Sequence, residues 1–109
     1  MTLTEKRCLP CEKGAPPLAE AVVADYMRQV PQWELGQGGK EISRLFAFDS
    51  YWAGLGFTNA VAWIAQAEKH HPDIELKYKK VKVSYSTHAV GGLSENDFIC
   101  AAKVDRLIA

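Results

Sequence analysis

The residues best suited to chemistry in this sequence are its three histidines, which all lie within nineteen positions, at His70, His71 and His88. The pKa of an unperturbed imidazole, about 6.5, lies closer to neutrality than that of other side chains, so clustered histidines suit proton transfer or metal ligation. The stretch continues through Gly91-Gly92 to Asp97. We therefore expect one functional site built from residues 70–97.

Zinc is the first alternative for such a cluster, because three histidines can form an open catalytic zinc site. However, His70 and His71 are adjacent, and on a helix with 3.6 residues per turn their side chains would point about 100° apart. Adjacent histidines seldom share one metal in that geometry, and no flanking carboxylate pattern supports a zinc site. We expect acid–base chemistry without a metal or cofactor, with different roles for the two histidines.

Length and charge limit the class of protein. The 109 residues predict a single domain, residues 1–109, in which residues 1–15 form an N-terminal arm. The 13 lysines and arginines balance the 13 aspartates and glutamates, which leaves no electrostatic footprint for nucleic acid or an anionic membrane. No signal-peptide-like or membrane-spanning apolar stretch occurs in the sequence. We expect a cytoplasmic protein that binds neither nucleic acid nor membrane.

The three cysteines do not suggest a disulfide framework, because their number is odd and no secretion signal precedes them. Cys8 and Cys11 form a Cys-Leu-Pro-Cys motif, which could be half of a zinc site or a redox pair. Cys100 is predicted to lie in a helix without a neighbouring partner. Because the motif lies in a proline-rich leader, the simplest interpretation is two thiols in an N-terminal arm.

Helical and strand patterns alternate along the chain. Apolar spacings of three or four residues predict a helix over about residues 18–30, a long helix from Tyr51 to about Lys69, and a last helix capped by Ser94. Alternating patterns predict two hairpins, 33–36 with 41–48 and 74–78 with 81–87. The simplest fold is a two-layer α+β domain of order α-β-β-α-β-β-α. Its four-stranded antiparallel sheet has one face covered by the helices.

This fold brings the candidate residues together. His70 and His71 would lie at the end of the long helix, and His88 where the last strand leaves the sheet. Asp97 would lie in the first turn of the last helix. There, Ser94-x-x-Asp97 also fits a capping box, in which the acidic side chain returns to the backbone at the start of the helix. A purely structural role for Asp97 is therefore as open as a role in the site.

The spacing of these residues resembles the signature of the pterin-4a-carbinolamine dehydratases, namely His70-His71-Pro72, Tyr78, His88 and Asp97. The likeness covers nearly the whole chain, from the Cys-x-x-Cys leader and Gly-Ala-Pro-Pro-Leu to Gly-Gly-Leu-Ser and the last helix. One departure is Gln66, four residues before His70, where the family usually has an ionisable side chain. This departure would affect the pKa of a histidine and the pH optimum, and it does not remove the histidines.

The family removes water from 4a-hydroxytetrahydropterin, a by-product of aromatic amino-acid hydroxylation, to give quinonoid dihydropterin. The resemblance therefore implies a hydro-lyase that recycles the hydroxylase cofactor and needs no metal or cofactor of its own. One imidazole would protonate the leaving hydroxyl and another would take a proton from a ring nitrogen. We expect His71 and His88 to exchange the protons and His70 to hold or polarise the hydroxyl. The implied catalytic residues are His70, His71 and His88, and the implied substrate-binding residues are Pro72, Ser86, Thr87 and Asp97.

The alternative is a non-catalytic binding or assembly factor on the same scaffold. Animal members of the family also act as dimerisation cofactors of a homeodomain transcription factor, and some bacterial relatives without the histidines assemble a carbon-fixing enzyme. The intact histidine set favours the enzyme. The resemblance also implies a homodimer or homotetramer and a hydroxylase in the same pathway. Trp52 and Trp63, off the main apolar stripe of the long helix, fit either a subunit interface or the core.

Overall fold

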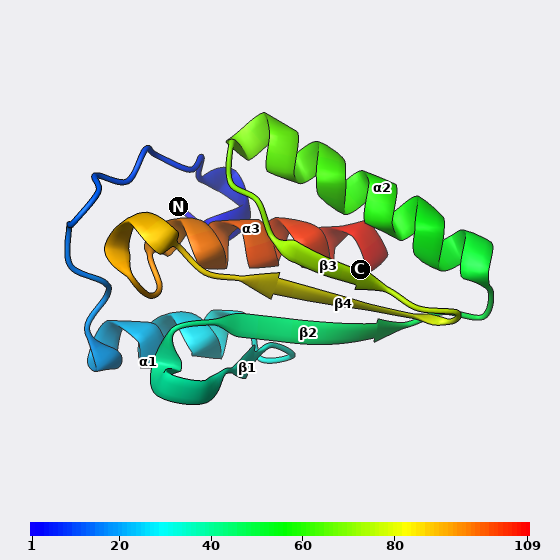
Figure 1. Cartoon of the computed structure of the whole chain (residues 1–109), viewed down its shortest axis with the longest axis horizontal. Helices are drawn as coiled ribbons and strands as arrows, with labels where there is room; N and C mark the ends of the chain where they lie inside the picture. The colour runs from blue at the N-terminus through cyan, green and yellow to red at the C-terminus, as the bar shows by residue number, and fades with distance from the viewer.

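The computed structural model describes the whole chain apart from the side chain of Gln37. Its four strands form one antiparallel sheet in the order β1-β2-β4-β3, so the two hairpins meet through β2 and β4 (Figure 1). The strands are β1 (Glu34–Leu35), β2 (Ile42–Ala47), β3 (Asp73–Leu76) and β4 (Lys80–Tyr85). The predicted α+β class and antiparallel sheet are confirmed, although β1 is shorter than expected.

Three α-helices pack against the sheet and against one another. They are α1 (Glu20–Gln29), α2 (Tyr51–Glu68) and α3 (Glu95–Asp105). Helix α3 contacts β4 and lies against both α1 and α2, so the helices form one layer (Figure 1). Short 3-10 turns complete the chain at Leu3–Glu5, Gln37–Gly39, His88–Val90 and Arg106–Ile108. No helix in the described part of the chain is long and apolar enough to cross a membrane.

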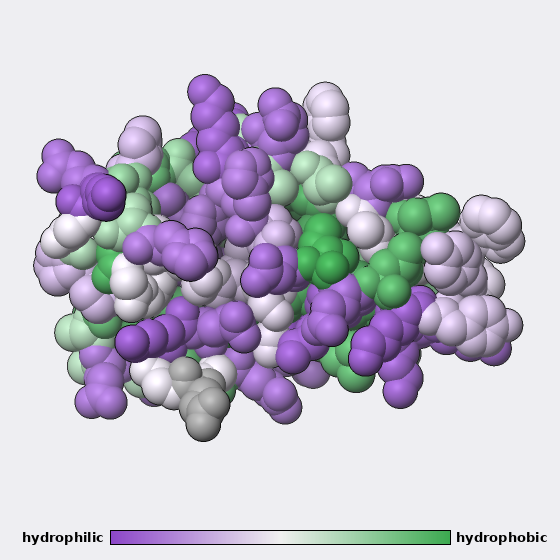
Figure 2. All heavy atoms as spheres, in the orientation of Figure 1, coloured by the Kyte–Doolittle hydropathy of each residue, from purple (hydrophilic) through white to green (hydrophobic). Residues whose placement is uncertain are grey.

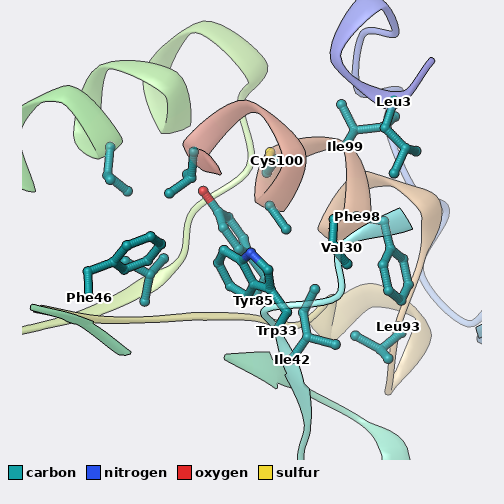
Figure 3. Packing of buried hydrophobic residues seen from close by; sticks show 14 of the residues in the cluster. Leu3, Val30, Trp33, Ile42, Phe46, Tyr85, Leu93, Phe98, Ile99 and Cys100 are labelled. Carbon is teal, nitrogen blue, oxygen red and sulfur yellow. The ribbon is translucent and has the colours of Figure 1, made fainter. Parts of the chain in front are cut away.

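A hydrophobic core fills the space between the two layers (Figure 3). Ile42 of β2 and Tyr85 of β4 are cross-strand partners, and both are fully buried. Trp33 lies beside them with its ring centroid 5.9 Å from that of Tyr85. Phe98 contributes the α3 side of the cluster. Burial of each such side chain contributes about 1.5–3 kcal/mol to the stability of the fold. The core therefore fixes the end of β4 and the start of α3, which flank the loop that carries His88.

Helix α2 ends within one residue of the predicted end at about Lys69, so both histidines lie beyond it. Lys69 adopts a left-handed conformation with φ of 56°, so the helix stops at Glu68. His71 precedes Pro72, and a residue before proline avoids the helical region, which explains why the chain leaves the helix before the histidines. The expectation that His70 and His71 are successive helical residues was therefore wrong, and the 100° argument for their roles does not apply.

The N-terminal arm is packed against the rest of the chain. Leu3 is buried against α3, and the backbone N–H of Gly14 donates to the carbonyl of Ala89 at 2.8 Å. The thiol of Cys8 lies 3.5 Å from that of Cys100 in α3, and both cysteines are free. Cys100 lies in a helix without a neighbouring cysteine in the sequence, as predicted, and the thiol that it contacts in the fold is 92 positions away.

Candidate functional site

His70 follows Lys69, the residue that ends α2, and is held against a buried carboxylate. Its Nε2 atom lies 2.6 Å from Oδ1 of Asp97. The His70 side chain is only 12% exposed, and the Asp97 side chain has no exposed surface. An ionised carboxylate accepts hydrogen bonds and cannot donate them, so Nε2 carries the hydrogen when the ring is neutral. Nδ1 is then the nitrogen with a free lone pair.

Asp97 also accepts two hydrogen bonds at its second oxygen. Oδ2 lies 2.8 Å from the hydroxyl of Thr87 and 2.9 Å from the backbone nitrogen of Ser94. The second of these contacts belongs to the capping box at the start of α3. A negative charge is favourable at this end of a helix. One carboxylate therefore joins the end of α2, the end of β4 and the first turn of α3.

Tyr85 supports the other side of the His70 ring. The two rings are stacked with their centroids 5.8 Å apart and their planes at 9°. The Tyr85 hydroxyl is buried without a hydrogen-bond partner among the described residues, and Figure 3 shows it directed toward α3. Burial raises the pKa of this hydroxyl, and the nearby Cys100 and Cys8 thiols raise it further. The Tyr85 side chain is therefore neutral, and its ring packs flat against the ring of His70 and so orients it.

The three histidines line one cavity of about 490 Å³. His71 and His88 are exposed to it, whereas His70 is largely covered. Ser86 and Thr87, from the end of β4, form the adjoining wall. A cavity of this volume with a few converging polar groups is typical of a small-molecule site. The loop that carries His88 closes with Gly91 at φ of 67°, a conformation that glycine adopts without strain.

The structure brings most of the predicted site residues to this cavity. Five of the seven line it directly, namely His70, His71, Ser86, Thr87 and His88. Of the other two, Pro72 does not line the cavity in the part of the chain that is described, and Asp97 lies behind His70 and Thr87. A smaller hollow of about 220 Å³ is also lined by His88, Ser86 and Thr87, together with Lys40.

Several residues of the cavity were not predicted. Asn96 and Glu68 line it, as does the arm segment Cys8–Cys11. The Cys-x-x-Cys motif was visible in the sequence, but no pattern connected it with histidines 59 or more positions away. Gln66, the departure from the family signature, is exposed on α2, while the carboxylates next to the histidines are Glu68 and Asp97.

Glu68 anchors the arm through charge. Burial raises the pKa of its carboxyl, but hydrogen bonds from Lys103, the Cys8 backbone and Arg7 together outweigh burial and lower that pKa to about 2. Its two oxygens lie 2.8 Å from the Cys8 nitrogen and 2.8 Å from Nζ of Lys103. Glu68 is thus ionised, and both of its carboxylate oxygens accept hydrogen bonds. Across the described residues, no three histidine, cysteine or acidic side chains are grouped as metal ligands.

The family follows from the comparison with known sequences. The sequence model of the family described as "Pterin 4 alpha carbinolamine dehydratase" matches residues 16–107, so the chain belongs to this family. The resemblance inferred from the histidine spacing is therefore confirmed. The match begins after the N-terminal arm, so the arm segment that lines the cavity lies outside the matched residues.

Individual relatives agree with this assignment. A protein of Nitrosospira multiformis, provisionally named pterin-4-alpha-carbinolamine dehydratase, is 51% identical to this chain over 96% of this chain and 91% of its own length. A protein of Xanthomonas campestris with the same provisional name is 53% identical over 96% of this chain and 89% of its own length. A transcriptional coactivator/pterin dehydratase from Brucella melitensis has a similar structure, with a TM-score of 0.81 and 28% identity over 85% of this chain and 99% of that chain. A pterin dehydratase-like protein described as a RuBisCO assembly factor in the alpha-carboxysome gives a TM-score of 0.61 and 25% identity, over 70% and 88% of the two chains.

Proposed function

We propose that this protein is a hydro-lyase that dehydrates 4a-hydroxytetrahydropterin to quinonoid dihydropterin, and that His70, His71 and His88 carry the chemistry. The observation that supports this most directly is the common cavity of the three histidines, one of which is anchored to a buried aspartate. Family membership gives the substrate class. The protein would recycle the pterin cofactor of an aromatic amino-acid hydroxylase.

The reaction breaks one bond and moves two protons. A proton is added to the 4a-hydroxyl oxygen, the C4a–O bond breaks with its electron pair leaving on water, and a proton leaves a ring nitrogen. His71 and His88 suit these proton transfers because both are exposed to the cavity without hydrogen-bond partners in the described chain. His70 suits a positioning role, because Asp97 and Tyr85 fix its ring. Its free Nδ1 can accept a hydrogen bond from the substrate hydroxyl.

Asp97 and Thr87 would then shape the site from behind. Asp97 fixes the hydrogen on Nε2 of His70 and fixes the Thr87 hydroxyl, which leaves less freedom for the groups that meet the pterin. Ser86 and Thr87 supply the polar wall next to His88. We place Pro72 as the residue that turns the chain after His71 and so orients it.

The test measures dehydration of a 4a-hydroxytetrahydropterin generated in situ by a hydroxylase, against the spontaneous rate, from pH 6 to 9. We expect acceleration by the wild-type protein. His88→Ala should lower it about 10²- to 10⁴-fold with the fold intact, because the side chain is exposed. Lys77→Ala, in the exposed turn between β3 and β4, is the matched control and should keep full activity.

Each outcome has a definite meaning. Near-normal turnover in folded His88→Ala would contradict the role of that histidine. If the folded wild-type protein gives no acceleration, the dehydratase proposal is wrong. The alternative would then be a non-catalytic binding or assembly role, of the kind that the names of the two structural relatives describe for those proteins.

We also propose that the protein is a homodimer or homotetramer that associates through α2. Trp52 and Trp63 are 76% and 72% exposed, so neither contributes to the core of the monomer. The helix carries no charged side chain before Glu68. An exposed face without charges and with two tryptophans is typical of a subunit interface.

A further inference from the structure

The arm segment, residues Cys8–Cys11, forms part of the histidine cavity although it lies outside the residues matched by the family. Figure 1 shows the arm running past the loop between β4 and α3, which carries His88. Leu9 is 69% exposed although it lines a cavity. An exposed leucine at the wall of a small-molecule site has apolar surface available for a ligand, because nothing in the monomer covers it.

Asn96 holds the arm segment in this position. Its Oδ1 accepts a hydrogen bond from the Leu9 nitrogen at 3.1 Å, and its Nδ2 donates to the Leu9 carbonyl at 2.7 Å. Nδ2 also lies 3.4 Å from the sulfur of Cys11. The side-chain amide therefore hydrogen-bonds both the backbone N–H and the backbone carbonyl of Leu9, as a neighbouring β-strand would. A carboxylate at this position could accept but could not donate.

Two further contacts hold the arm on the two sides of Leu9. On one side, the Cys8 nitrogen donates to Glu68 at 2.8 Å. On the other side, the Gly14 nitrogen donates to the carbonyl of Ala89, the residue after His88, also at 2.8 Å. The arm thus bridges the end of α2, the start of α3 and the histidine loop. Asp97 also joins two of these elements, the end of α2 and the start of α3, beneath the cavity.

We propose that the arm segment Cys8–Cys11 is a wall of the pterin site, with Leu9 as an apolar contact for the substrate and Asn96 as the positioning residue. This inference rests on the proposed dehydratase function. The side chains of Leu9 and Pro10 have no group that transfers a proton, and the proposed proton transfers use only the histidines. The wall therefore contributes to substrate binding and orientation, while the histidines perform the chemistry. Its loss should raise KM and leave kcat unchanged.

The first experiment compares Leu9→Ala and Asn96→Asp with the wild type. Leu9→Ala leaves the core intact because the side chain is exposed, and Asn96→Asp keeps the size of the side chain but removes the donor to Leu9. We expect each change to raise KM about tenfold with kcat within about twofold, which corresponds to about 1.4 kcal/mol of binding. Leu107→Ala, at a leucine that is 42% exposed outside the cavity, is the matched control and should change neither constant.

The second experiment is independent of turnover. Cys11 is alkylated with iodoacetamide with and without saturating 7,8-dihydrobiopterin, and the modification is located by fragmentation of the tryptic peptide 8–13. Pterin binding is followed in parallel by equilibrium dialysis. We expect the bound pterin to slow alkylation of Cys11 at least fivefold in the wild type and less in Asn96→Asp.

The outcomes separate this inference from the proposed function. Protection of Cys11 from alkylation, together with the rise in KM, supports the proposal that the arm segment is a wall of the pterin site. Binding of the pterin without protection, or equal losses of kcat in Leu9→Ala and Asn96→Asp, overturns the wall and leaves the dehydratase standing. Absence of pterin binding in the folded wild type overturns both proposals.

Discussion

At the scale of single residues, Asp97 shows that a structural role and a role in the site need not be alternatives. Its Oδ2 atom takes the capping interaction from Ser94, and its Oδ1 atom holds His70. The sequence left the two interpretations open because the capping pattern is local, whereas the contact with His70 spans 27 positions. The two oxygens of one buried carboxylate serve both purposes.

We expect Asp97→Asn to lower both stability and activity. The buried amide has one acceptor oxygen where the carboxylate has two, so the contacts of one oxygen are lost and the unfolding free energy should fall by about 1–3 kcal/mol. The dehydration rate should fall about 10- to 100-fold, because the tautomer and orientation of His70 are no longer fixed. Urea unfolding and the dehydration assay measure the two effects.

Ser94→Ala is the matched control for this prediction. It removes the capping hydroxyl and should lower stability by about 1 kcal/mol while the contact between Asp97 and His70 persists. If Ser94→Ala lowered the rate as much as Asp97→Asn, the role of Asp97 would be structural alone.

Glu68 gives a prediction for pH dependence. Because its pKa is lowered from the ordinary 4.5 to about 2 in the folded protein, its contribution to stability is fully present above pH 4.5. That contribution is lost as the pH falls from 4.5 toward 2. We expect it to amount to about 2 kcal/mol, after allowance for the exposed Arg7 partner, whose side chain is 69% exposed.

The measurement is urea unfolding of the wild type and Glu68→Gln from pH 7 to 2.5. The difference between the two proteins should be constant above pH 4.5 and shrink below it. Parallel curves through the acidic range would show that Glu68 is not the group responsible.

At the scale of elements, the sequence predicted the helices and strands, whose apolar patterns repeat along the chain. It did not predict the packing of the N-terminal arm, which depends on contacts between residues far apart in the sequence. The apolar spacing predicted α2 and α3, and the alternation predicted β2 and β4, because these patterns repeat within each element. The packing of the arm segment could not be predicted, since the contacts of Leu9 with Asn96 join residues 87 positions apart and have no local pattern. For the same reason Asn96 was not predicted, whereas the three histidines, Ser86 and Thr87 were implied by the family signature.

The end of α2 gives a prediction at this scale. Lys69 has φ of 56° and is the only residue other than glycine with a positive φ in the described chain. We expect Lys69→Gly to raise the unfolding free energy by about 0.5–1 kcal/mol, because glycine adopts this conformation without strain. Lys69→Val should lower it, since a β-branched side chain is disfavoured there. Urea unfolding at pH 7 tests both, and a Lys69→Gly protein less stable than the wild type would contradict the assignment of strain.

At the scale of the whole molecule, α2 exposes two tryptophans, Trp52 and Trp63, to solvent. Figure 2 shows hydrophobic residues among hydrophilic ones on the half of the molecule in which α2 begins. Trp52 and Trp63 are eleven residues apart, which is about three helical turns, so they lie on the same face of the helix. Such a face fits the proposed contact with a second copy of the chain.

The oligomer proposal is tested by Trp63→Glu. A charge in the centre of an apolar interface would have to be desolvated on association, so we expect the dimer or tetramer to dissociate into smaller species. Light scattering coupled to gel filtration measures the mass, and the emission of Trp52 should shift to longer wavelength as the interface opens. Tyr78→Glu is the matched control, because Tyr78 is also 72% exposed but lies between β3 and β4, away from α2. A wild-type protein that remains a monomer at high concentration, or an equal loss of mass in Tyr78→Glu, would show that the α2 face does not carry the assembly.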